Sequence, residues 1–212
     1  DRLDRGALEL ALVGDLEESQ AIELVARTLG ALPPREAEFR PYDKNRARSF
    51  TADRSPRIIR HRGEPDQAIV RLIWPTTDLD DWELTSRLTL LERVTQLVLT
   101  ERLREELGET YSPAATSAPS DIYEDYGTFS ISAEVGTDRV DAAREAMIET
   151  VAALREGSIG ADLVERARKP LIESLDNRLK SNSGWLALVD RAQSKPEDIA
   201  RFLQAKDRQL AI

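Results

Sequence analysis

The stretch QAIVRLIWPTTDLDDWELTSRLTLL, residues 67–91, decides the fold, because its hydrophobic pattern changes in the middle. The first part, Gln67–Trp74, is an almost continuous apolar run, which is typical of a central β-strand. From Asp80 to Leu107 the leucines and valines instead recur at spacings of three and four, which is the period of an α-helix. We therefore expect a strand followed by a long and largely buried helix.

The residues that follow this helix predict a second pair of strands and two further helices. Gly127–Val135 (GTFSISAEV) alternates apolar and polar residues, and Thr110–Ala118 precedes it as an antiparallel partner. Apolar residues at helical spacing then predict one helix over Val140–Leu154 and another over Ile159–Leu179. Pro170 lies inside the second helix and is expected to kink or interrupt it. Two more helical segments, Trp185–Val189 and Pro196–Leu210, complete a helical C-terminal third.

The residues that precede the stretch predict a strand, a turn and a helix. Ala7–Val13 (ALELALV) reads as the strand, and the apolar positions between Ile22 and Leu29 read as the helix. Asp15 is the candidate N-cap of that helix, because its carboxylate can accept hydrogen bonds from exposed amides of the first turn.

A connection and a hairpin are expected between this helix and the central strand. Residues 33–56 are charged, aperiodic and rich in proline, which indicates a long surface connection. Arg57–Arg62 reads as a strand that forms a hairpin with Gln67–Trp74 through the turn residues between them.

These elements together predict an α+β fold in which helices cover one face of a mixed, largely antiparallel sheet. We expect residues 1–212 to form one domain, with a core over about 7–180 and a helical C-terminal segment over about 181–212. The chain starts at Asp1 and its only methionine is Met147, so we expect it to be a piece of a longer protein.

The composition excludes several classes of function. The chain has 39 acidic and 30 basic residues, and its net charge of −9 disfavours binding to nucleic acid. It contains no cysteine, which excludes disulfides and cysteine-based metal sites. No run approaches the roughly 20 apolar residues that span a bilayer. The compartment stays open between the cytoplasm and the bacterial periplasm.

The catalytic groups of common hydrolases are also missing from the sequence. A zinc hydrolase with a helical motif needs two histidines, and His61 is the only histidine. We expect His61 to be a surface residue among arginines. The serines show no nucleophile-elbow pattern, and the carboxylate pairs, such as Asp80 with Asp81 and Glu105 with Glu106, are explained by solvated faces or loops.

The sequence RLREELGETYS, residues 102–112, is the one stretch that suggests a site. A helix ends there, Gly108 breaks it, and a strand is expected to begin at Tyr111, so Arg104 and Tyr111 can be presented at one end of the sheet. A guanidinium and a phenol are hydrogen-bond donors that can hold a peptide carbonyl or an oxyanion. The alternative is structural: Arg104 pairs with a helix terminus or a glutamate, and Tyr111 packs as a strand aromatic.

RLREELGETYSP, followed after a loop by YGTFSISAEV, resembles the second-domain motif of the pitrilysin or insulinase (M16) family of zinc metallopeptidases. In that motif an arginine is followed seven residues later by a tyrosine. LALVGDLEESQAIELVARTLGALP and the stretch at residues 67–91 resemble the flanking elements of the same domain, so the similarity covers roughly residues 7–180.

The resemblance implies a substrate-closing domain that is inactive alone, in which Arg104 and Tyr111 contact the backbone of a peptide near the scissile bond. It implies that this chain binds no cofactor, and that zinc belongs to the missing domain of the intact protein. The expected partners are a peptide or polypeptide substrate and the zinc-binding half, on the same chain or on another subunit. No partner nucleic acid and no membrane span are expected.

Two other interpretations remain open. Homologous halves in this superfamily also serve as peptide-binding or scaffold subunits without peptidase activity, and the chain can be one of these. The motif match can also be accidental, in an unrelated α+β binding domain. A structure without a mixed sheet under the long helix would establish that last interpretation.

Overall fold

The computed structural model describes every residue except 1, 61, 64–65, 108–111 and 158. The chain divides into two compact units. Unit 1 comprises Asp1–Asp43 and Ile172–Asp207, and unit 2 comprises Lys44–Leu171 and Arg208–Ile212. The expectation of a single domain stays a prediction.

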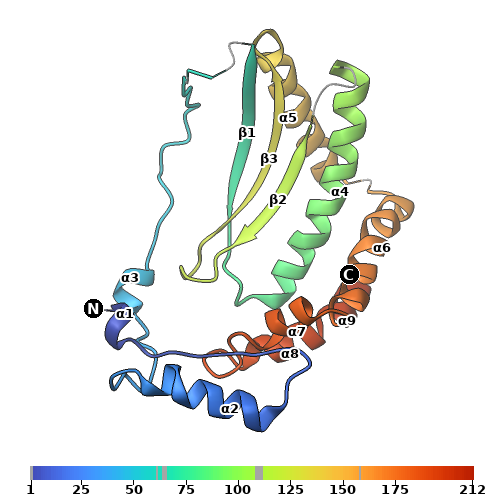
Figure 1. Cartoon of the computed structure of the whole chain (residues 1–212). Coiled ribbons are helices and arrows are strands. Elements are labelled where there is room, and N and C mark those ends of the chain that lie inside the picture. Colours follow the sequence, from blue (N-terminus) through green and yellow to red (C-terminus); the bar gives the residue numbers. More distant parts are fainter. Residues whose placement is uncertain (1, 61, 64–65, 108–111, 158) are drawn as a thin grey trace. The chain divides into compact units, whose positions relative to one another are not determined.

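Unit 2 contains a three-stranded antiparallel sheet with the order β1-β3-β2 (Figure 1). Its strands are β1 (Gln67–Thr76), β2 (Ala114–Pro119) and β3 (Gly127–Gly136). The predicted strands at these three places are therefore confirmed. The described part of β2 begins at Ala114, later than the predicted Thr110, and positions 110 and 111 lie outside the described residues.

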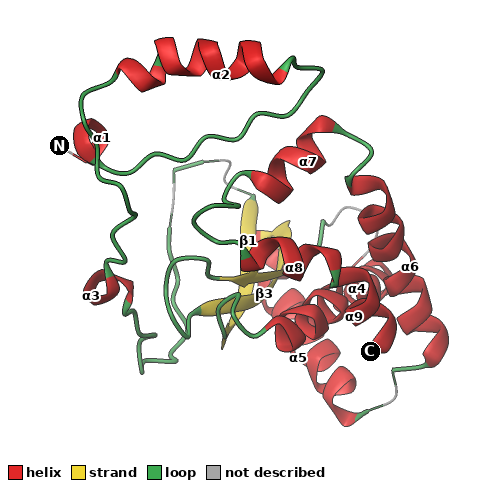
Figure 2. Cartoon of the chain, turned by 90° about the horizontal axis from the view of Figure 1, so that it is seen from below, coloured by secondary structure: helices red, strands yellow, loops and turns green. Residues whose placement is uncertain are grey.

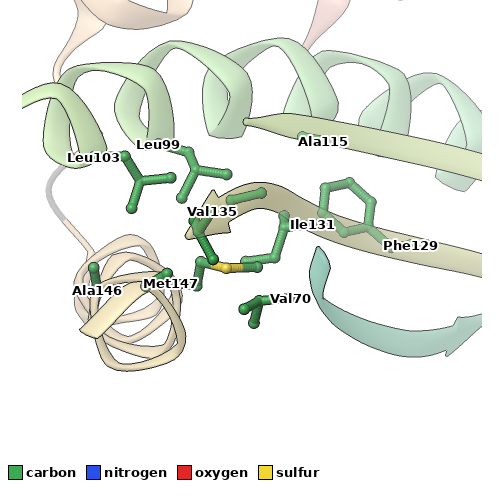
Figure 3. Packing of buried hydrophobic residues seen from close by; sticks show 11 residues of the cluster. Val70, Leu99, Leu103, Ala115, Phe129, Ile131, Val135, Ala146 and Met147 are labelled. Atoms are coloured by element: carbon green, nitrogen blue, oxygen red, sulfur yellow. The ribbon is translucent and has the colours of Figure 1, made fainter. Parts of the chain in front are cut away.

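Two helices, α4 (Trp82–Leu107) and α5 (Val140–Glu156), cover one face of this sheet (Figure 1). Along β3 every second residue is buried, so the predicted alternation is the alternation of the two sheet faces. Figure 3 shows Leu99 and Leu103 of α4 meeting Ile131 and Val135 of β3, with Met147 of α5 beside them. The predicted α+β fold with helices on one face is confirmed.

A second group of buried residues joins α4 to α6 (Ala161–Arg178). It consists of Leu90 and Val94 of α4 and Ala167 of α6, with partly buried leucines around them. α5 ends at Gly157, which has a φ of 100° and therefore adopts the left-handed conformation that favours glycine after a helix. Pro170 lies inside α6 without interrupting it.

The predicted hairpin before β1 is wrong. After α3 (Asp43–Arg46) the described residues 57–60 form no strand, and Figure 2 draws the segment after α3 as loop. Neighbouring side chains of a strand point to opposite faces of a sheet. Ile58 and Ile59 are neighbours, so a strand in a sheet with one covered face would bury only one of them. The residues on either side of the pair are arginines, so the segment has little apolar surface to bury as a strand.

Unit 1 is made of helices and connections. It contains α1 (Arg2–Arg5), α2 (Glu18–Arg27), the 3-10 helix η1 (Leu29–Ala31), α7 (Asn182–Val189) and α8 (Glu197–Leu203), together with the start of α9 (Ala205–Ala211). The predicted helical C-terminal third is confirmed, with a break at Gln204 inside the segment expected as one helix.

Two predictions for the start of the chain are wrong. Ala7–Val13 is not a strand, because the described residues of unit 1 provide no other strand with which it can pair. The N-cap of α2 is Glu17 and not Asp15, and its side chain makes no capping hydrogen bond. The helix thus begins two residues later than an Asp15 cap requires.

Candidate functional site

One side of α4 carries a row of polar residues spaced four apart: Glu92, Gln96, Thr100 and Arg104. Side chains at this spacing are neighbours on a helix surface. The Nε2 of Gln96 donates a hydrogen bond to the hydroxyl of Thr100 over 3.0 Å, so the row is physically connected at its centre. The apolar positions of the same stretch are Val94, Leu97, Val98, Leu99 and Leu103.

The first two members of the row hold the outer edge of β2. The backbone N–H of Ala115 donates to Oε1 of Gln96 over 2.8 Å, and Nε2 of Gln96 donates to the carbonyl of Pro113 over 2.9 Å. The N–H of Ser117 donates to a carboxylate oxygen of Glu92 over 2.9 Å. These side chains replace the neighbouring strand that this edge lacks, and so fix β2 against α4.

Arg104 is the last member of the row and lies two helical turns beyond Gln96, near the end of α4. Its neighbours have structural roles: Leu103 is buried in the core, and Arg102 forms an ion pair with Glu149 of α5. The side chain of Arg104 is exposed and has no hydrogen-bond or ion-pair partner among the described residues. The structural alternative of an Arg104–glutamate pair therefore finds no support in the described part of the chain.

Tyr111 lies outside the described residues, so the predicted pairing of Arg104 with Tyr111 stays a prediction. The structure does place the residues on both sides of the segment that joins α4 to β2. α4 ends at Leu107, and Pro113 is held by Gln96. Arg104 is thus a solvent-facing cation on α4, which can donate two parallel hydrogen bonds to a carboxylate or bind a peptide carbonyl.

The described residues contain no group of three or more histidine, cysteine, aspartate or glutamate side chains that could hold a metal ion. His61 lies outside them. Arg104 can donate hydrogen bonds and stabilise negative charge, but it cannot generate a nucleophile. What Arg104 itself offers is binding and charge stabilisation.

Unit 1 contains a separate hollow of about 650 Å³ between α2, the residues before it and α7. Its lining is almost wholly apolar and includes Leu12, Ile22, Val25 and Trp185, and Glu18 is the one charged residue that lines it. Several of the residues around it are exposed, including Leu12, Leu16 and Ile22. The sequence predicted that these residues belong to a core, so an apolar surface was not expected here.

Comparison with known protein families finds a match. The family described as the peptidase M16 inactive domain matches residues 4–171. The chain belongs to this family. A comparison with curated proteins finds no match.

Three solved structures have a similar fold. A protease from Helicobacter pylori matches 94% of this chain with a TM-score of 0.68 and 14% identity, and the periplasmic protease PqqL from Escherichia coli matches 94% with a TM-score of 0.60 and 16% identity. A peptidase M16 inactive domain from Pseudomonas fluorescens matches 93% with a TM-score of 0.57 and 17% identity.

The M16 domain described here is shorter than these proteins. It covers 48%, 22% and 48% of the three chains, in the order given above. At such identities the likeness concerns the fold alone. No described helix of the chain is long and apolar enough to cross a membrane.

The sequence analysis identified Arg104 but missed Glu92 and Gln96, which position the strand beside it. The spacing of Glu92 and Gln96 was the feature of the sequence that could have identified them. Both are polar, lie four residues apart, and interrupt a helix stretch predicted to be largely buried. A polar residue at such a position needs a hydrogen-bond partner, and the outer edge of a strand provides unpaired backbone groups.

Proposed function

We propose that this chain is the non-catalytic, substrate-closing domain of a zinc metalloendopeptidase, in which Arg104 and Tyr111 hold the peptide backbone near the scissile bond. Membership of the M16 inactive-domain family supports the peptidase context. The observation that carries the role is the exposed Arg104, which stands on a helix fixed to β2 while its own charge is unpaired among the described residues.

The proposed chemistry is hydrogen-bond donation. The Arg104 guanidinium and the Tyr111 hydroxyl would donate to a substrate carbonyl and stabilise negative charge as it develops on that oxygen. A pre-positioned donor requires little reorganisation during the reaction, and α4 supplies such a rigid base. Zinc and the base that activates water would belong to another part of the intact protein, since this chain has no pair of histidines.

The zinc-bearing half is the proposed partner, and the apolar surface of residues 7–32 is its proposed contact. This segment has eight exposed large hydrophobic residues, namely Leu8, Leu10, Leu12, Leu16, Ile22, Leu24, Leu29 and Leu32. An exposed apolar surface of this kind is typical of an interaction site. This chain covers 22% of the protease PqqL and 48% of the Helicobacter pylori protease, so each of these proteins has a further part at least as long as the part matched.

Kinetics of the intact protein test the role of the pair. Arg104→Ala and Tyr111→Phe should each lower kcat by about 10²-fold to 10³-fold, because each removes one donor to the oxyanion. The thermal unfolding midpoint should change little, because Arg104 is exposed and holds no described partner. Arg102→Ala is the matched control, two residues away, and should leave kcat unchanged because Arg102 pairs with Glu149. Near-normal kinetics for both test variants would contradict the proposal.

A second candidate function is a peptide-binding or scaffold subunit of the same superfamily without peptidase activity. The apolar surface of residues 7–32 favours it, because a permanent subunit interface is rich in such residues. The two candidates differ in one readout. An intact protein that binds a labelled peptide and releases it uncleaved, in the presence of zinc, supports the binding subunit and excludes the peptidase.

A further inference from the structure

Positive charge is concentrated in one short segment of this acidic chain. Residues 44–60, here called the basic arm, contain six basic and one acidic residue, which gives a net charge of +5. The whole chain has a net charge of −9, so the remaining residues carry −14. The net charge used in the sequence analysis conceals this separation. A segregated charge creates a local field that attracts partners of opposite sign.

The first part of the basic arm is fixed to the connection between β2 and β3. The Nε of Arg46 donates a hydrogen bond to a backbone carbonyl there over 2.9 Å. The guanidinium of Arg48 lies over the rings of Tyr123 and Tyr126, 5.1 and 4.8 Å from their centroids. Phe50 stacks on Tyr126, with ring centroids 4.2 Å apart. The first part of the arm is therefore anchored to the connection between β2 and β3.

The second part of the arm is exposed. Residues 51–60 form no helix or strand, and Figure 2 draws the segment as loop. Ile58 and Ile59 are 84% and 87% exposed, the highest values among the large hydrophobic residues of the described chain. An adjacent pair of exposed isoleucines beside arginines offers both apolar and ionic contacts.

Three arginines of this part recur at every third position: Arg54, Arg57 and Arg60. Arg57 lies 3.6 Å from Asp53, in an exposed pair of small energetic value. The Ser55 hydroxyl donates to Asp53 and holds the pKa of that carboxyl below its usual value, so Asp53 is charged at neutral pH. Arg54 and Arg60 have no side-chain partner among the described residues. Two of the three guanidinium groups are thus available for a partner.

We propose that the basic arm binds an acidic segment of a polypeptide. Guanidinium groups form paired hydrogen bonds with carboxylates, and the two isoleucines supply contact with apolar side chains between the acidic ones. A nucleic acid fits less well, because residues 51–60 contain no aromatic side chain on which a base could stack, whereas Ile58 and Ile59 suit the apolar side chains of a polypeptide. This inference goes beyond the proposed function and involves neither Arg104 nor zinc.

Binding of a fluorescent poly-L-glutamate peptide to the whole chain at low salt tests the proposal. The triple variant R54Q/R57Q/R60Q should bind at least about tenfold more weakly, and added salt should weaken wild-type binding more than residual variant binding. The control triple R144Q/R155Q/R166Q makes the same change of charge on α5 and α6 and should bind as the wild type does. The double variant I58S/I59S should weaken binding of a glutamate–isoleucine copolymer at unchanged net charge.

Several outcomes would overturn the proposal. The first is that the wild-type chain does not bind poly-L-glutamate. The second is that R54Q/R57Q/R60Q binds it as tightly as the wild type does. The third is that R144Q/R155Q/R166Q loses as much affinity as R54Q/R57Q/R60Q. Tighter binding of a single-stranded DNA oligomer than of poly-L-glutamate would overturn the choice of a polypeptide. The thermal unfolding midpoint of the arm triple should match that of the wild type, because these side chains are exposed. None of these measurements depends on peptidase activity, so they cannot be confused with a failure of the proposed function.

Discussion

The segment of residues 7–32 in unit 1 is richer in leucine and isoleucine than unit 2, and the two regions differ in what they bury. The buried hydrophobic residues of the described chain all lie in unit 2, with the exception of Leu188. Residues 7–32 have no buried residue at all. The difference teaches that an amphipathic pattern predicts a surface to be covered, but not which part of the protein covers it.

The largest expected effect separates these two regions by stability. Leu99→Ala in unit 2 should lower the free energy of unfolding by about 2–5 kcal/mol, because Leu99 is fully buried against the sheet and α5. Ile22→Ala in α2 should change it by less than about 0.5 kcal/mol, because Ile22 is exposed. Urea unfolding of the two variants measures both. Equal losses would show that residues 7–32 belong to a packed core.

An intermediate effect is expected where α4 holds the edge of β2. Gln96→Ala leaves the N–H of Ala115 and the carbonyl of Pro113 without their side-chain partner, at a cost of about 1–3 kcal/mol. Hydrogen exchange should become faster at Ala115. The neighbouring Arg93→Ala, on an exposed position of the same helix, is the control. Unchanged exchange at Ala115 would contradict the capping role of Gln96.

The smallest effect is expected at Glu9, which ties residues 7–32 to the turn after α7. Its carboxylate accepts hydrogen bonds from the Ser194 hydroxyl at 2.5 Å and from the Gln193 N–H at 2.6 Å. The Ser194 bond is the main reason why the pKa of Glu9 lies below its usual value. A carboxyl whose pKa is lowered on folding stabilises the folded state above its unfolded pKa. That stability is lost as the pH falls through the folded pKa.

Exchange of the Gln193 amide with solvent, followed against pH, measures this contact. Protection should decrease toward acidic pH in the wild type and should be weak and independent of pH in Glu9→Gln. A Gln193 amide that exchanges alike in both proteins would show that Glu9 does not hold this turn.

The sequence predicted the sheet and helices of unit 2 well, because the apolar face of each of these elements is buried against another element of the same unit. The apolar spacing between Asp80 and Leu107 became α4, and the alternation over Gly127–Val135 became β3, since both faces meet a partner inside the unit. Ala7–Val13 failed as a strand because a strand depends on a neighbour, which its own residues do not specify.

The candidate site was predictable in part for the same reason. The end of α4 followed from helical spacing and placed Arg104 near a helix terminus. The exposure of Arg104 could not be predicted from the sequence. It became clear from the structure, in which Leu103 faces the core and Arg102 pairs with Glu149. The spacing of Glu92 and Gln96 marked them as polar residues in need of partners, but it did not identify those partners, because the bonds join residues 17 to 25 positions apart.

Cleavage of a fluorogenic peptide by this chain, by the separately expressed zinc-bearing half and by their mixture tests the central claim most directly. The account predicts no cleavage by either part alone, zinc-dependent cleavage by the mixture, and its loss in a mixture made with Arg104→Ala. Cleavage by this chain alone, or equal cleavage by the zinc-bearing half with and without this chain, would contradict it.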